Sequence, residues 1–152
     1  MPEPARTPVV FAERLWPGPV GWALAVGFGV ALGIALFPVG VAVAATTGLV
    51  ALAAAVAVLV AWSPRVDVTA DELRAGGAHI ALSLLGPARV IERDGLQAEL
   101  GPRLDARAHL CQRGWIRSAV RVELVDPADP TPYWIVSSRR PHELAAALGA
   151  GA

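Results

Sequence analysis

The chain has 152 residues, enough for one compact domain or for a membrane anchor followed by a small domain. Hydrophobic residues make up 55% of the sequence and charged residues 17%, against about 25% charged in soluble domains, so some long stretch must be nearly free of charge. The net charge is zero, with 13 basic and 13 acidic side chains, which argues against a nucleic-acid-binding protein. The single cysteine, Cys111, excludes an internal disulfide and a multi-cysteine metal site.

Residues 15–64 carry no charged side chain. A helix that crosses a bilayer needs about 20 apolar residues, so this interval holds two spans and a short turn. The sequence therefore predicts a transmembrane helical hairpin over residues 20–62, with spans at Val20–Phe37 and Ala44–Trp62.

Two features of the sequence allow other interpretations of the hairpin. Pro38 and Gly40 mark the turn, but Thr46-Thr47-Gly48 offers a later one. The run Ala42-Val43-Ala44 has the small-x-small form of a signal-peptidase site, although the next residues form another span rather than a polar mature start. A hairpin buried in a soluble core would need far more surrounding protein than this chain supplies.

Aromatic and basic residues set the expected position of the hairpin. Tryptophans near the ends of the spans are predicted to lie at the membrane interface: Trp16, Trp22 and Trp62. Arg6 and Arg14 precede the first span, Arg65 and Arg74 follow the second, and the turn has no arginine. We therefore expect a plasma-membrane (inner-membrane) protein with both termini cytoplasmic, residues 1–19 being a cytoplasmic N-terminal segment.

Small residues recur every four positions in the first span, at Gly21, Ala25, Gly29 and Gly33. This spacing is typical of close helix packing, here within the hairpin or between protomers of an oligomer, although an Ala- and Gly-rich composition can produce it by chance. The spans contain no ionisable side chain or amide, which favours an anchor over a pump or channel.

Residues 65–149 have the pattern of a cytoplasmic β-rich domain. Period-two alternation predicts a strand around Val66–Val68, then a turn at Gly76-Gly77 and a second strand through Ile80–Leu84. Gly86-Pro87 is expected to break the chain before a short strand at Val90-Ile91.

The sequence signals for strands and helices are clearer in the second half of this domain. Leu96–Leu100 is predicted to form a helical turn and Ala108–Cys111 a strand, and the strands Ala119–Val125 and Tyr133–Ser137 flank a connection rich in proline and aspartate. Pro141 begins a short amphipathic helix that ends at Gly149. Antiparallel strands followed by one C-terminal helix predict an α+β, pleckstrin-homology-like domain, with a plain α+β sheet as the alternative.

The tail from Ala119 to Leu148, with its run Asp-Pro-Ala-Asp-Pro-Thr-Pro-Tyr-Trp-Ile-Val-Ser-Ser-Arg-Arg-Pro-His-Glu-Leu, resembles a known family. These are small actinobacterial membrane proteins grouped as a domain of unknown function, with two N-terminal spans and a cytoplasmic β-rich domain. The likeness extends to Glu13-Arg14-Leu15-Trp16, Asp71-Glu72-Leu73 and Trp115-Ile116-Arg117. It implies an architecture, but no activity and no catalytic residues.

No catalytic or metal-binding motif is complete in the sequence. His142-Glu143 begins like a zinc-protease helix, but Ala146 stands where the second histidine would be. His109 and Cys111 are spaced for two metal ligands, with no further pair to complete the coordination. We therefore predict no catalytic residues, no metal and no cofactor.

Arginines interleaved with tryptophan are the remaining candidates for a binding site: Arg113, Trp115, Arg117, Arg121, Arg139 and Arg140. Guanidinium groups bind phosphate or carboxylate, so these residues are candidates for contact with an anionic headgroup or a partner protein. The alternative is internal pairing with Glu123, Asp126 and Asp129, with Trp115 and Trp134 in the core.

These observations lead to one favoured function. The chain is predicted to be a membrane-tethered, non-enzymatic interaction or scaffold module, with the lipid bilayer and another membrane or cytoplasmic protein as partners. A domain that binds anionic lipid or a small ligand is the alternative, and an enzyme is the least favoured interpretation.

Overall fold

The computed structural model describes residues 8–149. The chain forms two compact units: a helical hairpin of Trp16–Ser63, and a domain made from the residues up to Leu15 together with those from Pro64 onward. The fold is α+β, with two long apolar helices, two β-sheets and a C-terminal helix.

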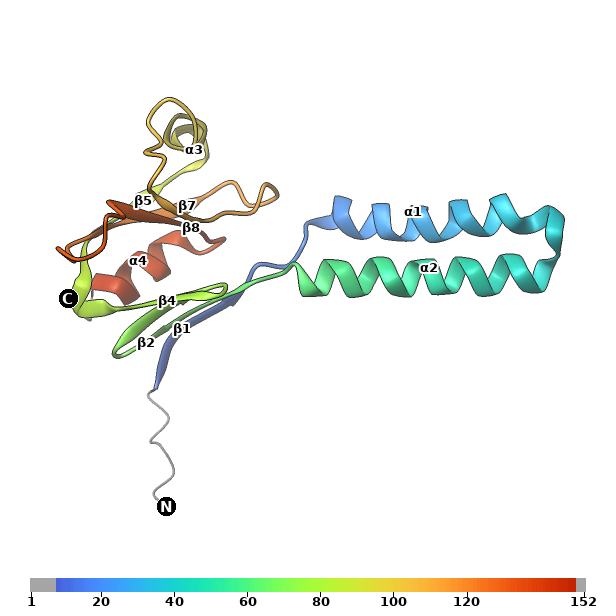
Figure 1. The fold of residues 1–152 in the computed structure, drawn as a ribbon, viewed down its shortest axis with the longest axis horizontal. Coiled ribbons are helices and arrows are strands. Elements are labelled where there is room, and N and C mark those ends of the chain that lie inside the picture. Colours follow the sequence, from blue (N-terminus) through green and yellow to red (C-terminus); the bar gives the residue numbers. More distant parts are fainter. Residues whose placement is uncertain (1–7, 150–152) are drawn as a thin grey trace, which may run out of the picture. The chain divides into compact units, whose positions relative to one another are not determined.

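The hairpin consists of α1 (Pro19–Leu36) and α2 (Val41–Ala61), joined by a 3-10 turn at Phe37–Val39 (Figure 1). Gly40 follows the turn with φ of +150°, a conformation that L side chains rarely adopt, so this position requires glycine. Both helices are long and apolar enough to cross a membrane. At 1.5 Å per residue, they are about 27 and 31 Å long, which matches a hydrocarbon core of about 30 Å.

The hairpin predicted over residues 20–62 is present, but two details differ. The second helix begins at Val41 rather than Ala44, and the later turn considered at 46–48 does not form, because α2 continues through it. The hydroxyl of Thr46 donates to the carbonyl of Ala42 (2.8 Å), one helical turn back, so this polar side chain is satisfied within the helix.

The first sheet has the order β1-β2-β3-β4, and all of its pairs are antiparallel. Its strands are β1 (Val9–Arg14), β2 (Arg65–Thr69), β3 (Glu72–Ala75) and β4 (Ala78–Ala81). The β1–β2 ladder continues beyond the strands, since the N–H of Leu15 donates to the carbonyl of Pro64 (2.9 Å). The entire helical hairpin is therefore the connection between two adjacent strands of this sheet.

The strand β1 was not predicted, because residues 1–19 were expected to form a separate segment. Local pattern alone did not identify it, since its hydrogen-bonding partner follows only after the 50 uncharged residues. Residues 1–7 lie outside the described part of the chain.

The second sheet has the order β5-β7-β8-β6. Its strands are β5 (Leu85–Ile91), β6 (His109–Cys111), β7 (Ala119–Leu124) and β8 (Tyr133–Ser137). The β5–β7 and β7–β8 pairs are antiparallel, whereas β6 lies parallel to β8, so the domain is not wholly antiparallel as predicted.

Two predicted boundaries near the middle of the domain are wrong. The strand expected through Ile80–Leu84 ends at Ala81, and residues 82–84 form a 3-10 turn instead. The break expected at Gly86-Pro87 is instead part of β5, where the pairing register shifts. Because β5 is an edge strand, the missing N–H of Pro87 does not interrupt the sheet.

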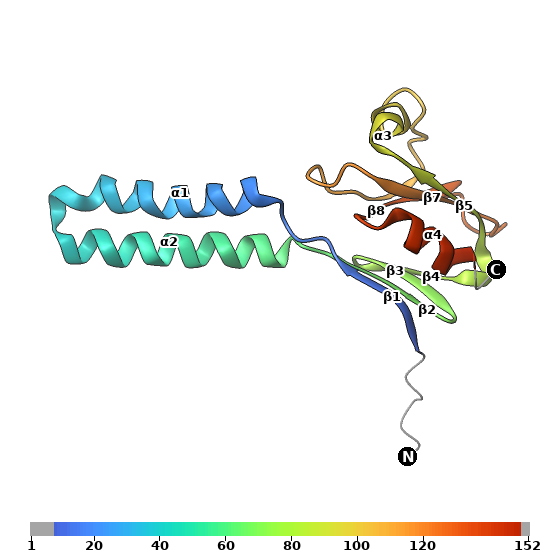
Figure 2. The same cartoon turned by 180° about the vertical axis from the view of Figure 1, so that it is seen from behind.

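The C-terminal helix α4 (Pro141–Gly149) lies between the two sheets in both views (Figures 1 and 2). One core joins the three layers, with buried residues from the first sheet, the second sheet and α4: Val66, Val68, Leu73, Val120, Val122, Val136, Leu144 and Leu148. The predicted helix start at Pro141 and the apolar stripe that it carries are confirmed.

The other face of the second sheet is covered by α3 (Arg93–Glu99) and the residues that follow it. A smaller core there contains Ile91, Leu96, Ala119, Tyr133 and Ile135. This second, outer core positions α3 and the buried carboxylate at its last residue.

Candidate functional site

The structure divides the six predicted arginine and tryptophan contacts among three places in the domain. Arg113, Trp115 and Arg117 lie in the loop between β6 and β7, Arg121 lies on β7, and Arg139 and Arg140 precede α4. These residues have different partners, so the structure does not gather them into one site.

Hydrogen bonds of Arg113 help to hold the β6–β7 loop. The N–H of Arg113 donates to Oγ of Ser137 (3.1 Å), and its guanidinium donates to the carbonyl of Gln112 (2.8 Å). Trp115 is 38% exposed, so the alternative that placed it in the core is wrong, whereas Trp134 is buried as that alternative expected.

Arg117 lines a groove of about 740 Å³ between this loop and α3. The other lining residues are Arg93, Asp94, Leu96, Gln97, Leu100, Gly101 and Gly114. The groove thus combines two arginines with one carboxylate and an apolar floor.

Arg139 and Arg140 help to attach the N-terminal strand β1 to α4. The hydroxyl of Ser138 donates to one oxygen of Glu13 (2.5 Å), and the N–H of Arg139 donates to the other (3.0 Å). The guanidinium of Arg140 donates to the carbonyl of Ala12 (2.8 Å) and lies over the ring of Phe11, 4.8 Å from its centroid. Segments separated by more than 120 residues therefore meet in one polar contact.

We call these five residues, Phe11, Ala12, Glu13, Ser138 and Arg140, together with the backbone of Arg139, the β1 clasp. Ser138 is fully buried, and its oxygen also accepts from the N–H of Arg140 (3.0 Å). The clasp uses Arg140 internally, which favours a structural role for this side chain over the predicted headgroup contact.

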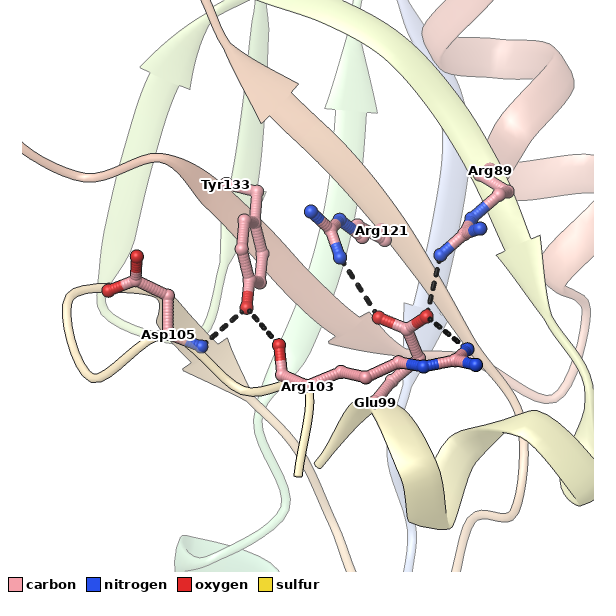
Figure 3. A network of polar contacts seen from close by, with 6 residues as sticks. All are labelled: Arg89, Glu99, Arg103, Asp105, Arg121 and Tyr133. Atoms are coloured by element: carbon pink, nitrogen blue, oxygen red, sulfur yellow. Dashed lines mark hydrogen bonds and ion pairs between the residues drawn. The ribbon is translucent and has the colours of Figure 1, made fainter. Parts of the chain in front are cut away.

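Arg121 belongs to a network around Glu99, the buried last residue of α3 (Figure 3). Arg89 and Arg121 are directly opposite each other on β5 and β7. Arg89 donates to one oxygen of Glu99 (2.7 Å) and Arg121 to the other (2.9 Å), while a nitrogen of Arg103 lies 3.6 Å away. Two like charges in this register would repel each other, and the carboxylate between them offsets that repulsion.

The acid partner of Arg121 is therefore Glu99, which was not among the three acids, Glu123, Asp126 and Asp129, that the pairing alternative proposed for the arginines. Asp126 and Asp129 instead accept hydrogen bonds from backbone N–H groups of their own turns, at Ala128 (2.9 Å) and Thr131 (2.8 Å). Both aspartates thus form Asx turns within the connection between β7 and β8.

Tyr133 holds the other side of the Glu99 network. Its ring lies under the guanidinium of Arg121, 3.7 Å from the centroid. Its hydroxyl accepts from the N–H of Asp105 (2.7 Å) and donates to the carbonyl of Arg103 (3.3 Å) (Figure 3). Glu99, Arg89, Arg103 and Tyr133 were not predicted, because only the packing of α3 on the sheet brings them together.

The electrostatics of Glu99 follow from this arrangement. Burial acts to raise the pKa of its carboxyl, but the hydrogen bonds and charges of Arg121 and Arg89 outweigh burial and lower the pKa below its ordinary value. The group therefore stays ionised at neutral pH.

The other ionisable candidates lie apart. His142 pairs with Glu92 (3.0 Å) at the surface, and the ring of His109 lies against that of Trp134, with centroids 4.3 Å apart and the planes tilted by 43°. Burial raises the pKa of the Cys111 thiol. Within residues 8–149, no three His, Cys, Asp or Glu side chains gather where a metal could bind.

The small residues predicted to pack closely lie on α1, and most of them face the inside of the hairpin. Ala25 and Gly29 are buried, and a Cβ on Gly29 would lie 2.9 Å from Cβ of Leu52 and 3.0 Å from the carbonyl oxygen of Gly48. A Cβ on Gly33 would lie 3.4 Å from the carbonyl oxygen of Ala44. By contrast, the nearest neighbour of Gly21 is Pro17, on the same chain segment, with Leu59 of α2 farther away at 3.9 Å.

The three tryptophans predicted for the membrane interface lie at the end of the hairpin that carries both chain connections. The ring centroids of Trp16 and Trp22 are 6.4 Å apart, and Trp62 directly follows α2 as its C-cap residue. All three side chains are at least 36% exposed within the hairpin unit.

These features define a protein with an apolar two-helix hairpin inserted into an α+β domain, in which three arginines surround the buried carboxylate of Glu99. Residues 10–148 match the family described as "Protein of unknown function (DUF3093)", and because the match covers nearly the whole chain, the protein belongs to this family. The predicted membership in a family of unknown function is thus confirmed. No curated protein and no solved structure matches the chain.

Proposed function

We propose that the protein is a membrane-anchored, non-enzymatic interaction module. Its hairpin crosses the plasma membrane twice, and its α+β domain, of the pleckstrin-homology-like type, works at the cytoplasmic face. The partner is a membrane or cytoplasmic protein, or an anionic ligand presented at that face.

Exposed apolar side chains carry the membrane assignment. Leu24, Ile34 and Leu49 are 69%, 70% and 67% exposed on the hairpin. Two helices packed through glycine and alanine bury only the seam between them, so the outward leucines, valines and phenylalanines need another apolar environment. A bilayer supplies it at the length that these helices have.

The arginine distribution supports the orientation. Arg6 and Arg14 precede α1, Arg65 and Arg74 follow α2, and the turn between the helices has no charged residue. By the positive-inside rule, both ends of the hairpin face the cytoplasm. Two sheets enclosing a C-terminal helix are the layout that supports the pleckstrin-homology-like assignment.

The lowered pKa of the buried Glu99 carboxyl favours a binding role over a catalytic one. A general acid or base works best with a pKa near the operating pH, whereas the pKa of Glu99 is lowered by its arginines. The same network presents cationic side chains to solvent, as a binding surface would.

Cysteine accessibility in intact cells tests the anchor and its orientation. On a Cys111→Ser background, Val39→Cys places a thiol at the hairpin turn, and Gly77→Cys places one on the domain where no atom crowds the new side chain. We expect a membrane-impermeant maleimide to label position 39 in intact spheroplasts and position 77 only after lysis. The reverse pattern would exclude the orientation, and full extraction by alkaline carbonate would exclude the anchor.

A further inference from the structure

The arginine cluster on the second sheet has more positive charge and more hydrogen-bond donors than its one carboxylate can use. Three guanidinium groups, of Arg89, Arg103 and Arg121, surround Glu99. Together they carry about fifteen N–H donors, whereas a carboxylate offers roughly four acceptor positions. The cluster therefore keeps a surplus charge of about two and donors that can bind a second anion.

The geometry also leaves space for that anion. A depression of about 310 Å³ is lined by Pro87, Arg89, Arg121 and Glu123, on the two strands that carry the opposed arginines. One water occupies about 30 Å³ of liquid, so the depression can hold a group of several heavy atoms. The Arg89 side chain is 62% exposed, so its guanidinium is accessible to a ligand from solvent.

Arg121 is fixed in place before any ligand arrives. Its side chain is only 23% exposed, held between the carboxylate of Glu99 and the ring of Tyr133. The hydroxyl of Tyr133 is itself bonded to the backbone of Arg103 and Asp105. A pre-ordered guanidinium loses little side-chain entropy on binding, which favours affinity.

We propose that Arg89 and Arg121 form a binding site for a phosphate group, with Arg103 adding positive charge. A phosphate carries close to two negative charges near neutral pH and three acceptor oxygens, which match the surplus charge and the donors of the cluster. Glu123, on the wall of the depression, opposes an anionic ligand and limits its affinity. This site names the ligand class of the interaction module proposed above and rests on that function.

Calorimetric titration of the full-length protein in neutral detergent micelles at low ionic strength tests the site, with inorganic phosphate as the probe. Arg89→Gln should weaken binding by about ten- to a hundredfold, the range for a hydrogen bond to a charged group. Arg74→Gln is the matched control, because Arg74 is equally exposed (61%) and paired with Glu72 on the first sheet, and it should leave binding unchanged. Glu123→Gln should strengthen binding, and acetate, a single charge, should bind more weakly than phosphate.

Three results would overturn the proposal. They are no phosphate binding to the wild-type protein, an equal loss of phosphate affinity in Arg89→Gln and Arg74→Gln, or weaker phosphate binding in Glu123→Gln than in the wild type. Because substitutions of opposite sign are compared, misfolding of one variant cannot imitate the expected pattern. The titration in micelles does not depend on topology, so its failure is distinct from failure of the membrane assignment.

Nanodiscs distinguish a lipid phosphate from a free one. The protein is placed in discs of phosphatidylcholine, with or without phosphatidic acid, and titrated again with inorganic phosphate. If inorganic phosphate binds more weakly in the discs with phosphatidic acid, and Arg89→Gln abolishes this difference between the two kinds of disc, the site binds a lipid headgroup. Equal binding in both discs, still sensitive to Arg89→Gln, assigns it to a soluble phosphate compound.

Discussion

Removal of the Glu13 carboxylate should detach the first strand of the domain. Glu13 accepts from the hydroxyl of buried Ser138 (2.5 Å) and from the N–H of Arg139 (3.0 Å), which join β1 to the start of α4. Glu13→Ala removes both acceptors and leaves the Ser138 hydroxyl without this partner in a buried position.

The expected cost follows from these two bonds. A hydrogen bond to a charged group contributes about 1.5–3 kcal/mol, and Glu13 is only half-buried, so the low end applies and the sum is about 2–4 kcal/mol. With a urea m-value of about 2 kcal/mol/M, the unfolding midpoint should fall by roughly 1–2 M.

Urea unfolding of the full-length protein in micelles measures this shift, followed by the fluorescence of buried Trp134 after the other four tryptophans are replaced by phenylalanine. Glu72→Ala is the control, because its partner Arg74 is 61% exposed and a surface pair contributes less than about 1 kcal/mol. Ser138→Ala combined with Glu13→Ala should cost less than the sum of the single changes. Equal midpoints for Glu13→Ala and Glu72→Ala would refute the role of the clasp.

Two further predictions concern the outer core and the hairpin. Glu99→Gln should lower the free energy of unfolding by about 1–3 kcal/mol at pH 7, because it weakens the hydrogen bonds from Arg89 and Arg121 and leaves these two side chains opposed, while their exposure (62% and 23%) limits the loss. Since the folded pKa of Glu99 is lowered, this stabilisation is present above the ordinary glutamate pKa and is lost as pH falls through the folded pKa, so wild type and variant should converge in acid unfolding profiles. Gly48→Leu should destabilise the hairpin by about 1–3 kcal/mol in dodecyl sulfate titrations followed by circular dichroism, because a Cβ there lies 3.0 Å from the carbonyl of Gly29, whereas Gly27→Leu, with open space, should not.

The sequence predicted the elements whose signals are local. A 50-residue uncharged interval, the alternation in Ala119–Val125 and a proline-started amphipathic helix each reflect the period of one element. The turn at Gly76-Gly77 was also predicted from the sequence. Gly76 has the positive φ (+67°) that glycine permits. These predictions match the structure.

The parts that were missed depend on contacts between distant segments. β6 pairs in parallel with β8, and no short motif signals such a pairing. Arg89, Glu99 and Arg121 meet across separations of 10 and 22 residues, so neither spacing nor charge pattern indicated that the unassigned Glu99 would be buried between two arginines. Arg121 was noticed only because it followed Trp115, which has a different environment.

The connection between β1 and β2 has a consequence for how the domain can be isolated. These strands are antiparallel neighbours, joined where a tight turn would ordinarily lie by the helical hairpin Trp16–Ser63. A fragment that begins at Arg65 lacks β1 and with it the buried side chains of Phe11 (5% exposed) and Leu15 (0%). Burial of two such side chains is worth about 3–6 kcal/mol, a large part of a total stability of about 5–15 kcal/mol.

We therefore expect a fragment of residues 65–152 to unfold easily, and a chain in which a short Gly-Ser linker replaces residues 16–63 to fold as a soluble domain. A flexible linker keeps the bond from the N–H of Leu15 to the carbonyl of Pro64 and does not need an N–H that proline lacks. Urea unfolding and amide hydrogen exchange compare the two proteins, with exchange protection expected in β2 only when β1 is present. If the fragment is as stable as the joined domain, β1 is dispensable and the hairpin is an addition to the domain rather than an insertion within it.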